Sequence, residues 1–117
     1  MGDLIDRAAF DSLLETIGDD PTFLAELIDT YLEDSEHLLD AMHQAIADAD
    51  TAELRRAAHS LKSNSASFGA RKLVSMAQEL EWRARDSTIE DAAARLANIA
   101  VAYADVRREL RTLRPVS

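Results

Sequence analysis

The stretch IEDAAARLANIAVAYADVRRELRTL, residues 89–113, decides the fold class of this chain. Its apolar residues recur in steps of three and four, at Ile89, Ala92, Leu96, Ile99, Tyr103, Val106, Leu110 and Leu113. A helix with one buried face has this periodicity, whereas a strand alternates at every second residue. Ser87 and Glu90 have capping-box spacing and predict where the helix begins, and Pro115 predicts its end near Arg114.

Four segments before it show the same periodicity. We predict a short helix over residues 6–17 and three longer ones over residues 21–49, 51–68 and 70–85. Gly18 is placed to end the short helix, and Asp20-Pro21 and Asp50 are placed to begin the next two. No proline falls between residues 22 and 114 and no strand pattern occurs, which predicts an all-α fold. Long amphipathic helices with short links indicate an up-and-down antiparallel four-helix bundle with a short extra N-terminal helix, in a single domain over residues 1–117.

Composition excludes several classes of protein. The chain has 117 residues, too few for two comfortable domains, and a formal net charge of −9. Because an acidic surface repels a phosphate backbone, we expect no nucleic acid partner. The absence of cysteine excludes disulfides and thiolate metal sites. No apolar run approaches the ~20 residues of a membrane span. Residues 1–10 also lack the apolar core of a signal peptide, so we expect a cytoplasmic protein with no membrane partner.

Charge is unevenly distributed along the chain. Residues 1–50 hold 14 acidic residues and one basic residue, a net charge of −13, whereas residues 51–117 hold 12 basic and eight acidic residues, a net charge of +4. Between Glu53 and Glu79 there is no acid, and the bases there are Arg55, Arg56, Lys62, Arg71 and Lys72. This window has two interpretations, a face that balances the acidic half of the chain or a site that handles an anion.

Two of the three histidines suggest a metal site, but their geometry argues against one. His37 and His43 each follow an aspartate by three residues, which is similar to the acid-x-x-His spacing of di-iron bundles. Both lie on one predicted helix, however, where six residues separate them by about 240° around the axis. We therefore expect no metal site. The chain also has no glycine-rich phosphate loop and no Gly-x-Ser-x-Gly turn, so neither ATP binding nor a serine nucleophile is predicted.

His59 is the candidate reactive residue. It follows Ala58, a member of the predicted buried stripe, and is therefore turned about 100° toward solvent. Its neighbours on the same face are Arg55, Arg56, Lys62 and Ser63, with Ala66 one turn further. The cations would stabilise a dianionic group on the ring, and the small side chains leave room for another protein to approach. The residues alone leave two interpretations open, a reactive histidine and a solvated surface histidine.

The stretch AHSLKSNSASFGA, residues 58–70, followed by Leu73 and by Leu80-Glu81, resembles the signature of histidine-containing phosphotransfer (HPt) domains. That signature usually reads Ala-His-x-Leu-Lys-Gly-x-Ser-x-x-x-Gly, with a Leu-Glu pair further along. The predicted layout, a short helix and then a bundle with the histidine on its second long helix, is also similar to this family. The resemblance covers nearly the whole chain.

The resemblance implies a module of a multistep His–Asp phosphorelay. Nε2 of His59 would accept a phosphoryl group from the aspartate of one receiver domain and pass it to the aspartate of another. The implied partners are response-regulator receiver domains and a hybrid histidine kinase, with the receiver bringing Mg²⁺ and this domain binding no cofactor. Lys62 matches the family lysine that supports the phosphoryl group, Gly69 matches the glycine that ends the histidine helix, and Glu81 falls near the site. We expect a monomer.

The docking patch that the family uses for receivers maps onto apolar residues near the N-terminus. These are Phe23 and Leu27, off the buried stripe, and Phe10, Leu14 and Ile17 on the first helix. Packing of the short helix against the core explains them equally well. One position departs from the signature, because Ser63 stands where the family often has glycine. Serine is still small and its hydroxyl can donate to a phosphoryl oxygen, so we expect function to survive.

Two alternatives are open. The dimerisation helices of histidine kinases carry a motif similar to His-Glu/Asp-Leu-x-x-Pro, but here Ser60 follows the histidine and no proline is near. Autophosphorylation is therefore not expected. The other alternative is a non-catalytic helical adaptor in which His59 is an incidental surface residue. Such an adaptor would bind a phosphorylated receiver without accepting its phosphoryl group.

Overall fold

The computed structural model describes residues 4–115, and the regular structure within this range is all helical. The helices are α1 (Arg7–Thr16), α2 (Pro21–Ala47), α3 (Thr51–Ser67), α4 (Arg71–Arg85) and α5 (Ala92–Leu113). The predicted all-α class is confirmed for the part of the chain that the structure describes. Residues 1–3 and 116–117 of the predicted domain lie outside that part. No helix of residues 4–115 is long and apolar enough to cross a membrane.

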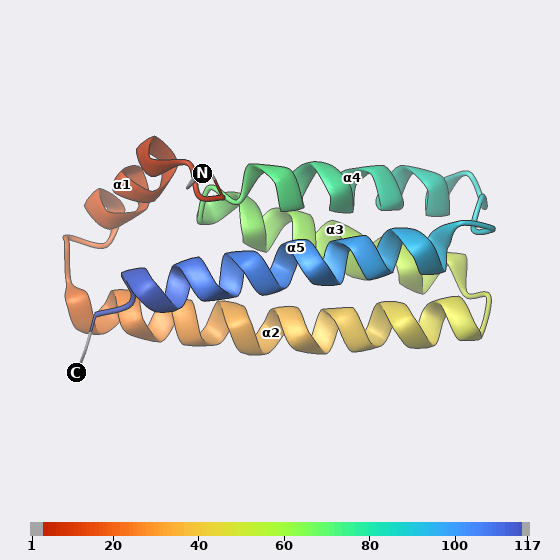
Figure 1. Ribbon diagram of the computed structural model, residues 1–117, viewed down its shortest axis with the longest axis horizontal. Coiled ribbons are helices and arrows are strands. Elements are labelled where there is room, and N and C mark those ends of the chain that lie inside the picture. Colours follow the sequence, from red (N-terminus) through yellow and green to blue (C-terminus); the bar gives the residue numbers. More distant parts are fainter. Residues whose placement is uncertain (1–3, 116–117) are drawn as a thin grey trace.

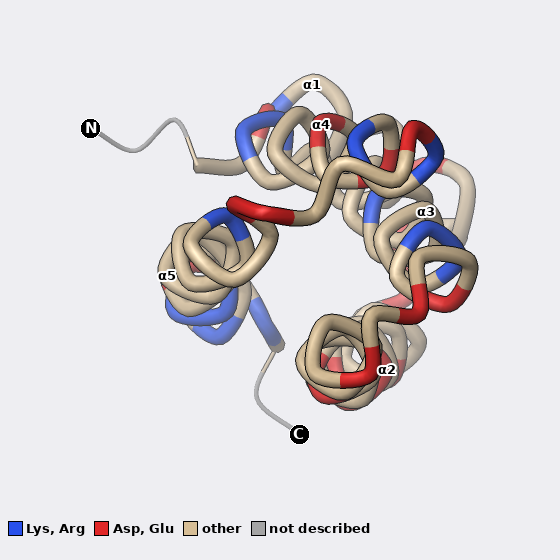
Figure 2. The backbone as a smooth tube through the Cα atoms, turned by 90° about the vertical axis from the view of Figure 1, so that its right-hand side faces the viewer, with Lys and Arg blue, Asp and Glu red and all other residues tan. Residues whose placement is uncertain are grey.

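Four long helices surround one core. The chain reverses direction at each link from α2 to α5, and α1 lies at one end of the molecule (Figure 1). α2 contacts α3 and α5, and α4 contacts the same two helices, which closes a ring (Figure 2). The apolar stripes of all four helices face its centre, where the large aliphatic side chains with under 2% exposure are Ile28, Leu54, Leu61, Leu73, Leu80, Leu96, Ile99 and Leu110. Burying each one stabilises the fold by roughly 1.5–3 kcal/mol.

The helix boundaries follow from the predicted capping residues. Asp20 accepts hydrogen bonds from the backbone N–H groups of Thr22 and Phe23, and Pro21 is the first helical residue of α2. Asp50 caps α3 by accepting from the N–H of Glu53 at 3.0 Å. Both carboxylates satisfy donors that would otherwise lack partners at a helix start. α2 ends at Ala47, two residues before the predicted end, because Ala49 takes a left-handed conformation with φ +54°.

The predicted capping box at Ser87 and Glu90 is wrong. Ser87 has φ +60°, and its N–H donates to the carbonyl of Ala84, so this residue closes α4 instead of opening α5. α5 begins at Ala92, and the carboxylate of Asp91 before it binds Arg95 at 2.8 Å instead of capping the helix. The Ser-x-x-Glu spacing alone does not indicate whether the serine ends the preceding helix or begins the next one.

Gly69 fixes the passage from α3 to α4 against the N-terminal segment. Its φ is +76°, and its carbonyl accepts a hydrogen bond from the N–H of Asp6 at 2.8 Å. A Cβ at this position would lie 2.8 Å from the Asp6 carbonyl oxygen and 3.0 Å from the Ala9 Cβ. Glycine is therefore required twice, for its left-handed conformation and for the close approach. This contact holds the start of α1 at the end of α3.

Candidate functional site

His59 lies on the outer face of α3, as predicted. Its side chain is 57% exposed, whereas the preceding residue, Ala58, is completely buried. The 100° step between consecutive helical residues accounts for the difference. An imidazole in this position is open to another protein while its backbone is held by the core.

Glu81 of α4 fixes which nitrogen of that imidazole is available. Its Oε2 lies 2.9 Å from Nδ1 of His59, across the groove between the two helices. An ionised carboxylate can only accept hydrogen bonds, so Nδ1 must carry the proton and donate it. In the neutral ring the other nitrogen, Nε2, then has the free lone pair. Nε2 is thus the ring nitrogen that has no hydrogen-bond partner among residues 4–115.

Lys62 completes a cluster of three residues with His59 and Glu81. Its Nζ lies 2.8 Å from Oε1 of Glu81, and the two side chains are only 23% and 13% exposed. Burial of Glu81 raises its pKa, but the hydrogen bonds from Lys62 and His59 and the positive charge of Lys62 outweigh that effect and hold the pKa below its ordinary value. Glu81 is therefore an ionised carboxylate at neutral pH. We call these residues the His59–Glu81–Lys62 cluster.

The other site residues predicted on α3 and at its end differ in exposure and in their contacts. Arg55, Ser63 and Ala66 are exposed on the same face of α3 as His59. Arg56 is also exposed, but its guanidinium is held by Glu53 through two hydrogen bonds of 2.9 and 2.7 Å. Gly69 is buried and serves the chain reversal described above.

The predicted docking patch is divided between core and surface. Phe10 is 2% exposed, so it packs in the core and cannot offer its ring to a partner; this part of the prediction is corrected. The reason is that α1 turns its Phe10 side inward against the bundle. Leu14, Ile17 and Leu27 are half-buried and Phe23 is 44% exposed.

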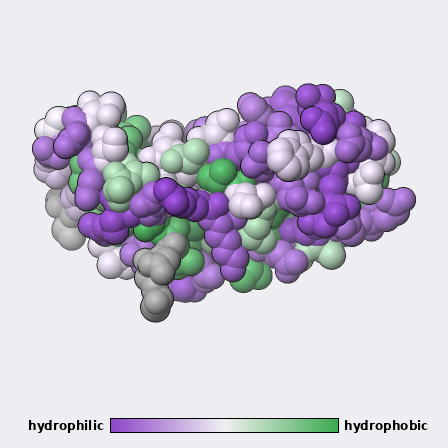
Figure 3. Space-filling view, turned by 90° about the horizontal axis from the view of Figure 1, so that it is seen from above, coloured by the Kyte–Doolittle hydropathy of each residue, from purple (hydrophilic) through white to green (hydrophobic). Residues whose placement is uncertain are grey.

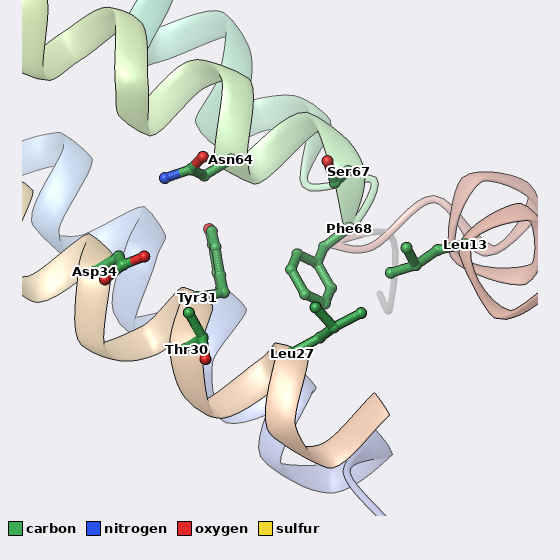
Figure 4. Close-up of a pocket in the computed structure, with 8 residues that line it drawn as sticks. All are labelled: Leu13, Leu27, Thr30, Tyr31, Asp34, Asn64, Ser67 and Phe68. Carbon is green, nitrogen blue, oxygen red and sulfur yellow. The ribbon is translucent and has the colours of Figure 1, made fainter. Parts of the chain in front are cut away.

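A hollow of about 230 Å³ lies between α1, α2 and α3 (Figure 4). Its apolar end is formed by Leu13, Leu27 and Phe68, and Asn64 and Ser67 of α3 lie along its rim (Figure 4). The face that α4 presents, seen from above in Figure 3, is mostly hydrophilic with hydrophobic residues as separate spots. The apolar hollow is thus on the α2 side of α3, and the charged cluster is on the α4 side.

Sequence reasoning missed Leu13 and the buried hydroxyls beneath the hollow. Leu13 lies on the same predicted apolar stripe as Phe10, Leu14 and Ile17, but only those three were assigned to the docking patch. Tyr31 and Ser65 form a buried hydrogen bond of 2.7 Å between α2 and α3. The sequence signal for this hydrogen bond was Ser65 on the predicted buried stripe, because a buried hydroxyl needs a polar partner inside the core.

The remaining histidines do not join the site. His37 and His43 are exposed on α2, and residues 4–115 contain no group of three or more side chains that could hold a metal ion.

Comparisons with known proteins agree with this geometry. The family model of the Hpt domain matches residues 26–114. Histidine-containing phosphotransfer protein B (HptB) from Pseudomonas aeruginosa PAO1 is 32% identical and superposes with a TM-score of 0.88, covering 97% of this chain and 96% of that one. ZmHP2 from maize is 22% identical, with a TM-score of 0.81 over 94% of this chain and 88% of that one, and supports the fold. Curated protein sequences show no significant match. An exposed histidine on α3 of a helical bundle, the family match and the likeness to HptB lead to one conclusion: the chain belongs to the Hpt domain family and has a histidine phosphotransfer role in a phosphorelay.

Proposed function

We propose that His59 is the residue that carries the phosphoryl group. The observation that supports this most directly is the hydrogen bond from Nδ1 to Glu81, which leaves Nε2 exposed with its lone pair. Nε2 would attack the phosphorus of an aspartyl phosphate on a receiver domain. The N–P bond forms as the P–O bond to the aspartate breaks, and the aspartate leaves as a carboxylate. The reverse reaction on a second receiver would discharge His59.

Glu81 and Lys62 would stabilise the charges that develop in this reaction, on the imidazole ring and on the phosphoryl oxygens respectively. When the N–P bond forms, the ring still carries its Nδ1 proton and becomes positively charged. The carboxylate of Glu81, 2.9 Å away, stabilises that charge and keeps the ring oriented. Lys62 holds the other carboxylate oxygen at 2.8 Å, and its ammonium has further protons to donate to a phosphoryl oxygen. Glu81 is thus a positioning residue, and Lys62 supports the phosphoryl group.

The partners we propose are response-regulator receiver domains, with a hybrid histidine kinase as the source of phosphoryl groups. Receiver and HPt bundle would meet over α3, which carries His59 on its exposed face and the apolar hollow lined by Leu13 and Leu27 on its α2 side. Phe23, Leu14 and Ile17, which are at least partly exposed at the start of α2 and along α1 and its C-cap, would add to this apolar surface. The receiver would bring Mg²⁺, and the antiparallel four-helix bundle would act in the cytoplasm as a monomer.

The test is transfer of labelled phosphate from a phosphorylated receiver domain to the wild-type chain and to the variant His59→Gln. We expect label on the wild type alone, stable in alkali and lost in acid, as for a phosphoramidate. Circular dichroism of the variant should be unchanged because His59 is exposed. A helical adaptor, the alternative function, would bind the receivers and take no label across a panel of them.

A further inference from the structure

The three cations around His59 differ in whether they are free to move. Arg56 is held by Glu53 through two charge-assisted hydrogen bonds, and Lys62 is held by Glu81 at 2.8 Å. Arg55 is exposed and makes no hydrogen bond or ion pair with any side chain in the described range, 4–115. In the sequence these residues form one basic cluster. In the structure Arg56 and Lys62 are ion-paired, whereas Arg55 has no ion-pair partner among the described residues.

Arg55 is also placed to reach the imidazole. It precedes His59 by four residues on α3, and residues at this spacing are neighbours on one helix face. The ion pairs of Arg56 with Glu53 and of Lys62 with Glu81 are locally neutral, so Arg55 carries the uncompensated positive charge beside His59. Its guanidinium is a planar fork with five donors, suited to binding two phosphoryl oxygens at once.

Phosphorylation creates a ligand for that charge. A phosphoryl group brings about −1.5 to −2 charges and three acceptor oxygens to Nε2. Arg56 would have to release Glu53 to bind those oxygens, and Lys62 is confined by Glu81, whereas Arg55 gives up no partner within the described residues. Resting on the proposed role of His59, we infer that Arg55 binds the phosphoryl group together with Lys62 and stabilises the phosphorylated form of the domain.

The inference predicts where the phosphoryl group lies at equilibrium. A labelled receiver domain is mixed with the wild-type chain, Arg55→Ala or Arg56→Ala, and the distribution of label between receiver and His59 is measured. We expect Arg55→Ala to shift this equilibrium about three- to five-fold toward the receiver, the size of an exposed charge contact. Arg55→Lys should recover part of the shift. Arg56→Ala is the matched control, with the same change one residue along, and should shift it less.

Measuring the same equilibrium at high salt distinguishes a direct contact between Arg55 and the phosphoryl group from the long-range electrostatic effect of the two arginines. In roughly 1 M salt the screening length is about 3 Å, so the effect of Arg56→Ala should disappear while part of the effect of Arg55→Ala persists. Equal shifts for the two variants at both salt concentrations would overturn the inference and leave the proposed function intact. Absence of label on wild-type His59 would instead contradict the proposed function itself.

Release of Arg56 provides a second test. Glu53→Gln removes the carboxylate that holds Arg56, while the cap on α3 is kept because Asp50 bonds the backbone N–H of residue 53. Added to Arg55→Ala, this change should return the phosphoryl equilibrium toward the wild-type value, because a free guanidinium is again beside His59. An equilibrium that stays at the Arg55→Ala value would contradict the requirement for a free arginine.

Discussion

The outer faces of α2 and α3 both carry an exposed histidine near charged residues, but only one of them has the parts of a reactive site. On α2, His43 follows Asp40 by three residues, and no hydrogen bond of its ring occurs among residues 4–115. On α3, His59 is bonded to a carboxylate that comes from a different helix. On α2 the acid and the histidine are therefore neighbours in sequence only, whereas His59 of α3 is hydrogen-bonded to a carboxylate of another helix.

The difference shows what orients a histidine. A carboxylate on the same exposed helix face is solvated and mobile, and its contribution is small. Glu81 is 13% exposed and held from the other side by Lys62, so its position is determined before the imidazole binds it. Neighbouring residues in sequence provide charge, but packing of α4 against α3 provides orientation.

The largest expected effect concerns the glycines that precede α2 and follow α3. Gly18 and Gly69 both have positive φ, but a Cβ meets open space at Gly18 and the Asp6 carbonyl at Gly69. We expect Gly69→Ala to lower the free energy of unfolding by about 2–4 kcal/mol and Gly18→Ala by about 1 kcal/mol. Urea denaturation of both variants measures this, and equal losses would contradict the close approach at Gly69.

The next effect concerns the carboxylates beside the two histidines. We expect Glu81→Ala to slow phosphoryl transfer to His59 about tenfold, because the ring loses its orientation and the support for its positive charge. Asp40→Ala, which removes the acid near His43, should leave the transfer rate unchanged. Rapid-quench measurements with one phosphorylated receiver provide both rates. The comparison fails if the two variants transfer at the same rate.

A smaller effect is expected for the lysine of the cluster. Lys62→Ala should slow transfer or shorten the lifetime of the phosphorylated form by a few-fold, and should change stability by less than about 1 kcal/mol. Lys72→Ala is the control, since Lys72 is an exposed lysine that lies outside the cluster. The decay of isolated phosphorylated protein gives the lifetime, and equal decay in all three proteins would remove Lys62 from the site.

The smallest effect is a pH dependence of stability. The pKa of Glu81 is lower in the folded protein than its ordinary value, so its ionised form stabilises the fold at neutral pH, and this contribution is lost as pH falls through the folded pKa. Relative to Glu81→Gln, the wild type should therefore be more stable near pH 7, by about 1 kcal/mol or less, and lose that advantage on acidification. Thermal unfolding of both proteins between about pH 7 and pH 3 tests the sign. A stability difference that grows toward low pH would contradict it.

Much of the fold was predictable because helices are local. The apolar stripes predicted most of the buried residues of the four long helices, and Asp20, Asp50 and Gly18 predicted boundaries that depend on backbone atoms only a few residues away. The predicted cap at Ser87 was wrong, because this residue lies between two helices and ends α4 instead of beginning α5. The prediction for Phe10 was also wrong, because an apolar residue on a short helix is equally suited to a core or to a docking surface until the helix is packed.

The sequence by itself determined that this chain forms long amphipathic helices and that His59 lies outside the buried stripe, since both follow from helical periodicity. The signature around His59 also pointed to the family. Only the tertiary structure decided which nitrogen of His59 is free, which cations are occupied and where the apolar hollow lies. These depend on atoms of separate helices, such as Glu81 Oε2 and His59 Nδ1 at 2.9 Å. Distances across helices are set by packing of the core, and no local pattern of residues specifies them.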